Sequence, residues 1–444
     1  MSMRAGLAHT MMALCASSLI AQSGCGEHVL VVTLENLSAE ATGISTYYRI
    51  DQDSFRSTTL TKDQLSGTGP KFGIRPPEGR SGTLDIQVFS YKDSLPCALN
   101  KGVTSADVGG SGPLDATAVL DQLPVGPCRA NDAPVSYPVD AKLWASAPNN
   151  VWIAGKDAVV LHWDGALFRN IVIPDSVTGS PKPTFRAIRG DSQGNIWLAG
   201  DAPFVVRIAA NGSATRLPIQ LGAVSSSTAP LLYQGIYAEG SAAWIVGTRN
   251  DPASGLIGGF VGTFDPARSE FAVTETDKIP GVSSSYPLFG IDCASGTDCW
   301  FVGSGLILRA QNGIYKEQLI YSDGTTCTFK SSADLRAVYA NSDINLVKMI
   351  GASGRYVFYN GKCFNSATQD AAMRTIGSDL LAIGAHSSKD LILVGSNALY
   401  RWRASAPEQI FPTELAPWQS VSALSAGFFV TAQTGRIFYA PLLP

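Results

Sequence analysis

Few side chains in this sequence belong to the types that carry enzyme chemistry, and their spacing does not bring them together. The 444 residues include four histidines, no two of which are close in the sequence: His9, His28, His162 and His386. No Ser-His-Asp constellation, paired carboxylates or histidine-rich metal spacing stands out. The sequence therefore predicts no catalytic residue, no metal ion and no cofactor.

Cysteine is the other reactive residue, and the residues before Cys25 indicate export. Arg4 is followed by an apolar run over residues 5–21 and then by Gln22, Ser23, Gly24 and Cys25. This order is typical of a targeting segment that is removed. It resembles a bacterial lipoprotein signal, although Gln22 stands where that group usually has leucine. The resemblance implies a signal peptide over residues 1–24 and a lipid on Cys25. Ordinary secretion is the alternative.

Hydropathy and charge narrow the location and the partners. No later stretch reaches the ~18 apolar residues that a membrane span needs, so the lipid is the only membrane attachment we expect. The expected location is the cell envelope, as an outer-membrane lipoprotein on the periplasmic or outer surface, and otherwise outside the cell. The net charge is −3 and there is no basic tract, which argues against nucleic-acid binding.

The remaining cysteines suggest disulfides. An even number in an exported protein favours pairing, and six are left once Cys15 and Cys25 are set aside. Cys293 and Cys299 flank a short turn, so they can face each other across a hairpin at disulfide distance. The other two pairs follow by elimination and by domain, and join Cys97 to Cys128 and Cys327 to Cys363. No Cys-x-x-Cys occurs, so zinc is the weaker interpretation.

Residues 25–127 predict a small β-domain. Candidate strands lie at residues 28–34, 44–50, 83–91 and 117–123, separated by turn-rich polar stretches. Residues 83–91 alternate most cleanly between apolar and polar positions. About 100 residues with this rhythm favour an Ig-like β-sandwich. Residues 128–140 contain prolines and predict a linker.

Residues 141–444 carry a degenerate repeat. Each copy is two short strands joined by a polar turn, and a glycine ends the second strand at intervals of 44 to 56 residues: Gly155, Gly200, Gly247, Gly303, Gly351 and Gly395. A seventh copy has Ala432 in that place. Repeats of this length with about four strands predict propeller blades. The expected fold is all-β: a seven-bladed β-propeller preceded by the Ig-like sandwich.

Two details of the repeat carry expectations about packing. We expect its tryptophans to fill the wedge between neighbouring blades, and its glycines to permit a tight turn with positive φ.

The last copy lacks an outer strand, and we expect residues 134–139, within the 128–140 linker, to supply it. Residues 149–155 and 162–165 resemble the repeat of bacterial cell-envelope propeller lipoproteins, and residues 191–197 are similar to that of sensor-kinase regulator propellers. The resemblance implies architecture rather than chemistry.

The inner strands offer candidates to line the central channel, where polar groups converge on a ligand. They are Arg186, Arg189, Tyr237, Asp292, Arg336 and Tyr339. These residues can equally plug the channel with hydrogen bonds and salt bridges. The sequence thus predicts a binding or scaffold protein that presents the propeller to a protein or polysaccharide. The alternatives are a lyase or hydrolase acting on glycans in the channel, and a purely structural assembly factor.

Overall fold

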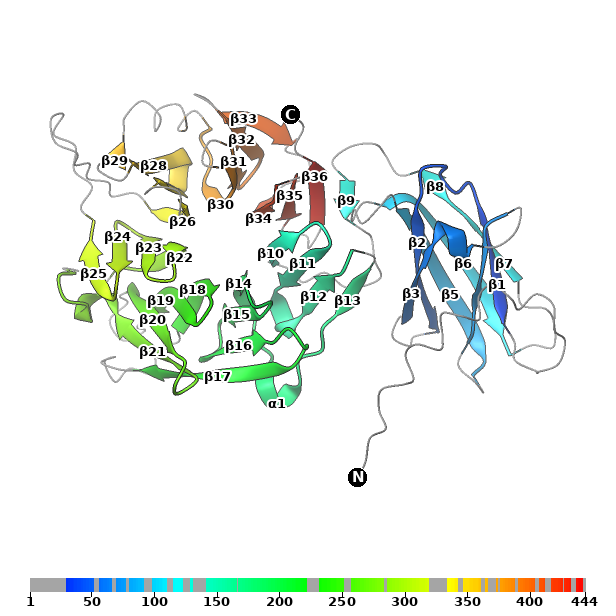
Figure 1. The fold of residues 1–444 in the computed structure, drawn as a ribbon, viewed down its shortest axis with the longest axis horizontal. Helices are drawn as coiled ribbons and strands as arrows, with labels where there is room; N and C mark the ends of the chain where they lie inside the picture. The colour runs from blue at the N-terminus through cyan, green and yellow to red at the C-terminus, as the bar shows by residue number, and fades with distance from the viewer. Residues whose placement is uncertain are drawn as a thin grey trace. The chain divides into compact units, whose positions relative to one another are not determined.

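The computed structural model shows an all-β protein whose strands fall into two compact units (Figure 1). The first unit holds β1 to β8, and most of the later strands belong to the second. The structure describes residues 29–51, 56–65, 69–76, 80–91, 98–109, 115–122, 128–130, 141–165, 167–221, 231–250, 257–282, 286–318, 334–341, 346–360, 364–365, 373, 376–387, 390–403, 407–411, 417–425, 427–432 and 437–441.

Two sheets of the first unit share one hydrophobic core. The strand orders are β4-β1-β7 and β3-β2-β5-β6-β8. Leu84, Ile86 and Val88 of β5 are fully buried and alternate with half-buried polar residues, as the sequence predicts for residues 83–91. The same core takes side chains from β1, β2, β4 and β7. The bounds are β1 (Leu30–Glu35), β2 (Gly43–Ile50), β3 (Arg56–Thr61), η1 (Lys62–Gln64), β4 (Lys71–Ile74), β5 (Gly82–Tyr91), β6 (Ala98–Val108), β7 (Asp115–Val119) and β8 (Asp121–Gln122).

The second unit repeats a four-stranded antiparallel sheet and forms a β-propeller. Neighbouring sheets meet through their first strands in a closed series, from β10 through β14, β18, β22, β26, β30 and β34 back to β10. These inner strands therefore surround a common axis, as Figure 1 shows. The sheets begin with β10 (Lys142–Ala147), β11 (Asn150–Ala154), β12 (Val160–Trp163) and β13 (Phe168–Asn170), and continue with β14 (Phe185–Gly190), β15 (Ile196–Gly200), β16 (Phe204–Ile208), β17 (Ala214–Leu221), β18 (Leu231–Glu239), β19 (Ala242–Asn250), β20 (Ile257–Asp265) and β21 (Glu270–Glu275).

The later sheets keep the same order. They contain β22 (Leu288–Ser295), β23 (Asp298–Gly303), β24 (Ile307–Gln311) and β25 (Ile314–Glu317); β26 (Leu335–Asn341), β27 (Leu346–Gly351), β28 (Arg355–Asn360) and β29 (Phe364–Asn365); β30 (Leu380–Ser387), β31 (Asp390–Gly395), β32 (Leu399–Trp402) and β33 (Pro407–Phe411); and β34 (Trp418–Ala423), β35 (Gly427–Ala432) and β36 (Ile437–Pro441). Short helical turns are η2 (Lys156–Ala158), α1 (Asp175–Thr178), η3 (Thr276–Lys278) and η4 (Ala352–Gly354).

One outer strand belongs to two sheets. The first part of β17 pairs antiparallel with β16, and its end pairs in parallel with β21, with Ile219 opposite Phe271 and Leu221 opposite Val273. The two four-stranded sets therefore join into one sheet of eight strands. The sequence does not indicate this connection, because the repeat predicts each outer strand to end within its own sheet.

The outer strand of the last sheet precedes the repeat. The strand order is β34-β35-β36-β9, and β9 is Cys128–Ala130. The expected closure segment, residues 134–139, lies outside the described residues. The strand that the structure places beside β36 thus begins a few residues earlier than expected.

Aromatic residues of the repeat pack between neighbouring sheets. Trp197 of β15 meets Phe271 of the next sheet edge-on, with ring centroids 6.2 Å apart. Trp244 meets Phe301, and Trp300 meets Tyr359, each one sheet further on. Burial of these large rings supplies much of the apolar area between the sheets.

The repeat glycines serve close approach rather than a turn with positive φ. Gly200, Gly247, Gly303 and Gly351 do not have positive φ. A Cβ added at any of them would overlap a backbone carbonyl oxygen at or just before the start of the neighbouring inner strand; at Gly303 that oxygen belongs to Pro287. The expectation of positive φ at these positions was wrong, because the constraint comes from the adjacent strand.

Candidate binding surface on the inner strands

The inner strands carry a β-bulge beside the repeat glycine. In β14 the register shifts between Phe185 and Ala187, opposite Gly200, so Arg186 is the extra residue. The same shift occurs in β18, β22, β26, β30 and β34. A bulge turns its extra side chain away from the regular alternation of the strand. At four of these positions the glycine leaves room for the carbonyl that precedes the bulge: Gly200, Gly247, Gly303 and Gly351.

The six extra residues form what we call the bulge row. The residue before each bulge is buried, whereas every member of the row is half-buried. Two members on neighbouring strands touch: the guanidinium of Arg336 lies 4.6 Å from the ring centroid of Phe289. The row is Arg186, Gln234, Phe289, Arg336, Leu381 and Gln419.

The two arginines of the bulge row differ in their partners. Arg336 has an ion pair with Asp334 at 3.5 Å, and Asp334 also accepts a hydrogen bond from the Ser304 hydroxyl. Arg186 has no ion pair or hydrogen bond to another side chain in the described part of the chain. The Nε atoms of both arginines are buried without a hydrogen-bond partner among the described residues. A buried donor without an acceptor is costly, so both guanidiniums leave part of their hydrogen-bonding capacity unsatisfied.

Three other predicted residues meet on the inner strands, each of them three residues after a member of the bulge row. Arg189 of β14 lies 5.0 Å from the ring centroid of Tyr237 on β18, and 3.5 Å from a carboxylate oxygen of Asp292 on β22. The other Asp292 oxygen accepts the Ala340 N–H on β26 at 3.0 Å. Burial raises the pKa of Asp292, while the Arg189 charge opposes that shift. Burial also raises the pKa of Tyr237 to about 12. The network connects four consecutive sheets, which is a structural role.

Tyr339 lies opposite Lys348, a residue that the sequence interpretation missed. Tyr339 is half-buried on β26 and pairs in register with Lys348 on β27. Lys348 is 6% exposed, and burial lowers its pKa to about 8. The signal was present in the repeat, because Lys348 occupies the place of Trp152, Trp197, Trp244 and Trp300 in other copies.

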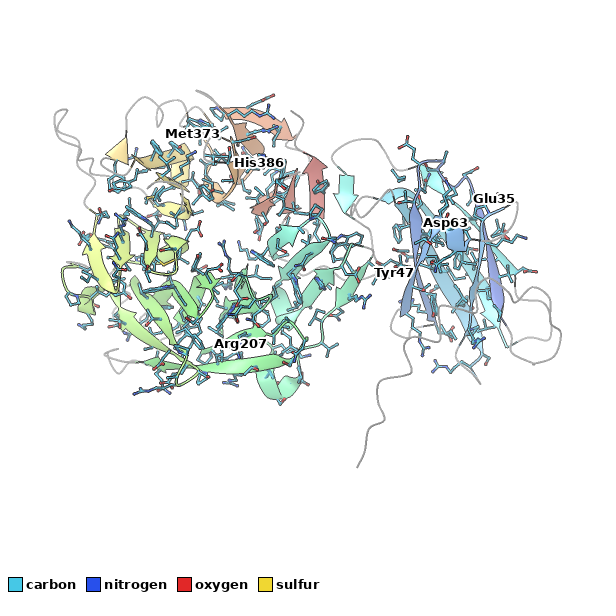
Figure 2. All side chains as sticks on the ribbon, in the orientation of Figure 1. Glu35, Tyr47, Asp63, Arg207, Met373 and His386 are labelled. Carbon is cyan, nitrogen blue, oxygen red and sulfur yellow. A yellow bond between two sulfur atoms is a disulfide. The ribbon has the colours of Figure 1, made fainter. Side chains whose placement is uncertain are left out.

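The described histidines have ordinary structural partners. The His162 ring stacks on Trp152 at 4.2 Å, and its Nε2 lies 2.8 Å from the amide oxygen of Asn150. That oxygen also accepts the Trp152 indole N–H. His386, on inner strand β30, is exposed and contacts the Leu424 carbonyl at 2.9 Å (Figure 2). Within the described ranges no three His, Cys, Asp or Glu residues gather to hold a metal.

One predicted disulfide is present. Cys293 and Cys299 face each other on β22 and β23 and are joined. Cys128 lies in β9, whose side chains are not described, and Cys97, Cys327 and Cys363 lie outside the described residues, as does Cys25. No described helix has the length and apolar character needed to cross a bilayer.

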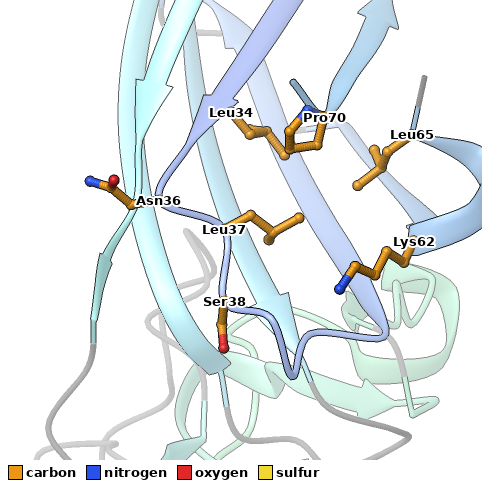
Figure 3. Close-up of a pocket in the computed structure, with 7 residues that line it drawn as sticks. All are labelled: Leu34, Asn36, Leu37, Ser38, Lys62, Leu65 and Pro70. Carbon is orange, nitrogen blue, oxygen red and sulfur yellow. The ribbon is translucent and has the colours of Figure 1, made fainter. Parts of the chain in front are cut away.

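A shallow pocket of about 460 Å³ lies in the first unit (Figure 3). Its apolar wall comes from Leu34, Leu37, Leu65 and Pro70. Lys62 stands at its rim, where its ammonium group donates to the Ala39 carbonyl at 2.9 Å. With one charged group already engaged and a mostly aliphatic wall, this pocket offers little for specific recognition.

Similarity to known proteins is found among solved structures. The chain matches no protein-family model and no curated protein. Among solved structures it is similar to YCF48 bound to D1 peptide, at 13% identity and a TM-score of 0.49, over 70% of this chain and 94% of that one. It is also similar to the WD40 β-propeller domain of Doa1, at 9% identity and a TM-score of 0.46, over 68% and 92%. A third is the computationally designed protein Ika8, at 10% identity and a TM-score of 0.44, over 80% and 93%.

Proposed function

We propose that this chain is an exported binding or scaffold protein that presents a seven-bladed β-propeller to a macromolecular partner. The bulge row carries the proposal. Six strands place a half-buried side chain at the same step, so neighbouring blades offer a series of side chains to a partner. The closed series of first strands supports a count of seven blades. The two sheets around one core support an Ig-like sandwich as the N-terminal domain.

Export and anchoring complete the proposal. The Cys293–Cys299 bond is of the kind that persists in oxidising compartments, which supports export. The residues before Cys25 support a lipid there, so the sandwich, which starts at Leu30, would follow closely after an outer-membrane anchor. Mass spectrometry of the mature N-terminus tests this part. A Cys25 that carries a lipid supports it, and an unmodified Cys25 or a start at another residue contradicts it.

The inner-strand chemistry favours binding over glycan cleavage. A lyase or hydrolase in the channel would need an acid and a base free to meet a substrate. The buried carboxylate of the inner strands, Asp292, already accepts the Ala340 N–H and faces Arg189. These contacts suit a residue that joins sheets, and they support the binding proposal.

Site-specific crosslinking tests the location of the partner. A photoreactive amino acid replaces Gln234 of the bulge row in one variant of the full chain and Ile314 in a matched control. Ile314 is 73% exposed on outer strand β25 and lies outside the row. Crosslinking in the cells that make the protein should yield a discrete adduct from position 234 alone. Adducts of equal yield at both positions, or at position 314 alone, would contradict a partner at the bulge row.

A further inference from the structure

The bulge row is basic although the chain is acidic overall. Its six members are two guanidiniums, two amides, one phenyl ring and one isobutyl group, and none is an acid. The whole chain has a net charge of −3. Asp334 offsets part of the Arg336 charge at 3.5 Å, but Arg186 has no such counter-charge in the described part of the chain. The row therefore presents local positive charge, which selects partners of opposite sign.

The hydrogen bonding of Arg186 is also compatible with an anionic group on the partner. The Nε of Arg186 is buried and donates to nothing among the described residues. A guanidinium recognises a carboxylate through paired donors, and such charged hydrogen bonds are stronger than neutral ones. A carboxylate arriving at Arg186 would thus supply the counter-charge that this guanidinium lacks among the described residues.

The other members of the row indicate what carries the carboxylate. Phe289 and Leu381 are apolar and half-buried, and they favour contact with apolar side chains. Gln234 can pair with peptide N–H and C=O groups through its amide head. Acidic polysaccharides offer carboxylates but no apolar side chains. A polypeptide that mixes acidic and apolar residues matches all three chemistries.

We propose that the bulge row binds an extended protein segment in which acidic and apolar residues alternate. This inference rests on the proposed function and specifies its partner. Arg186 and Arg336 hold carboxylates, Phe289 and Leu381 take apolar side chains, and Gln234 holds the peptide backbone. Binding weakens as salt rises, because screening reduces the attraction between exposed charges.

The test uses the full chain and a labelled peptide of about twelve alternating Glu and Leu residues, read by fluorescence anisotropy. Parallel titrations use the same peptide with Gln or Lys in place of Glu, and an oligogalacturonate. Arg186→Gln and Arg336→Gln are compared with Arg268→Gln, a control at an exposed turn outside the row. Arg186→Lys keeps the charge but loses the paired donors. A urea titration confirms that each variant is folded.

The Glu peptide should bind, and each row variant should weaken it about tenfold while Arg268→Gln leaves it unchanged. Arg186→Lys should restore part of the loss. The proposal is overturned if the Gln or Lys peptide binds as well as the Glu peptide, if the oligogalacturonate binds more tightly, or if the Glu peptide does not bind. Crosslinking at position 234 with full binding by the arginine variants would keep the proposed function and refute this inference alone.

Discussion

Lys348 departs from the tryptophan of the repeat, and burial of its ammonium group lowers the stability of the folded state. Four copies place tryptophan at its position, and burial there stabilises the contact between sheets. An ammonium group loses hydration when buried, which lowers its pKa, here to about 8. The folded state therefore binds fewer protons than the unfolded chain between about pH 8 and the ordinary lysine value of 10.5. By linkage, this residue adds stability as pH rises through that window.

Replacing Lys348 by methionine should remove that dependence. We expect Lys348→Met to raise the free energy of unfolding at pH 7 by about 1–3 kcal/mol, because no charge is then buried. The advantage over wild type should shrink at pH 10. Urea unfolding at both pH values measures it, with Lys316→Met on exposed β25 as the control. An advantage of the same size at both pH values would show that the charge is not the cause.

Asp292 tests whether the inner-strand network is structural. Asp292→Ala leaves the Ala340 N–H without an acceptor and Arg189 without its ion-pair partner, so it should cost about 2–4 kcal/mol in unfolding free energy. Asp292→Asn keeps an acceptor oxygen and should cost less. Asp265→Ala, at a half-exposed turn, should stay within about 0.5 kcal/mol. Equal losses in the Ala and Asn variants would refute a role for the backbone hydrogen bond.

At the scale of the element, the repeat glycine and the bulge are one device. The carbonyl before the bulge occupies the space that a side chain at the glycine would need. Ala432 stands opposite the bulge of β34, so that strand must leave more room. At Gly200, Gly247, Gly303 and Gly351 the glycine therefore also marks where the neighbouring inner strand turns out a side chain.

Gly303→Ala should accordingly disturb both stability and the bulge. The added methyl group overlaps the Pro287 carbonyl oxygen, and we expect a loss of about 2–4 kcal/mol. Gly69, where a methyl group meets nothing, gives the matched control, and Gly69→Ala should be neutral within about 0.5 kcal/mol. Thermal unfolding measures both. A neutral Gly303→Ala would mean that the inner strand can move without cost.

The repeated strands could be predicted from the sequence, but the reason why each repeat needs a glycine could not. The period of the glycines and the alternation in residues 83–91 reveal strands because they reflect local geometry. Which neighbour crowds Gly303 depends on the register of another strand, and that information is not local. For the same reason Arg189, Tyr237 and Asp292 could be named as candidates, whereas their meeting across three strands could not be foreseen.

At the scale of the whole molecule, the Cys293–Cys299 disulfide should contribute to the stability of the fold. Cys293 and Cys299 close a very short loop, so the bond should contribute only about 2 kcal/mol. The paired variant Cys293→Ala with Cys299→Ala should unfold with that loss, and reduced wild type should match it. Both are measured by urea unfolding. If these cysteines in the freshly isolated protein reacted with a thiol reagent before reduction, the bond would not exist in the cell.

The outer strand shared by two sheets has a consequence for motion. In repeat architectures each repeat contacts only its neighbours, so single repeats, here the four-stranded sheets, can open separately. The end of β17 is hydrogen-bonded to β21, so opening of one sheet must break backbone bonds of the other. Amide hydrogens in β15, β16, β20 and β21 should therefore exchange with solvent at a common rate and form one cooperative opening unit. Elsewhere around the ring, local opening is free to follow single sheets.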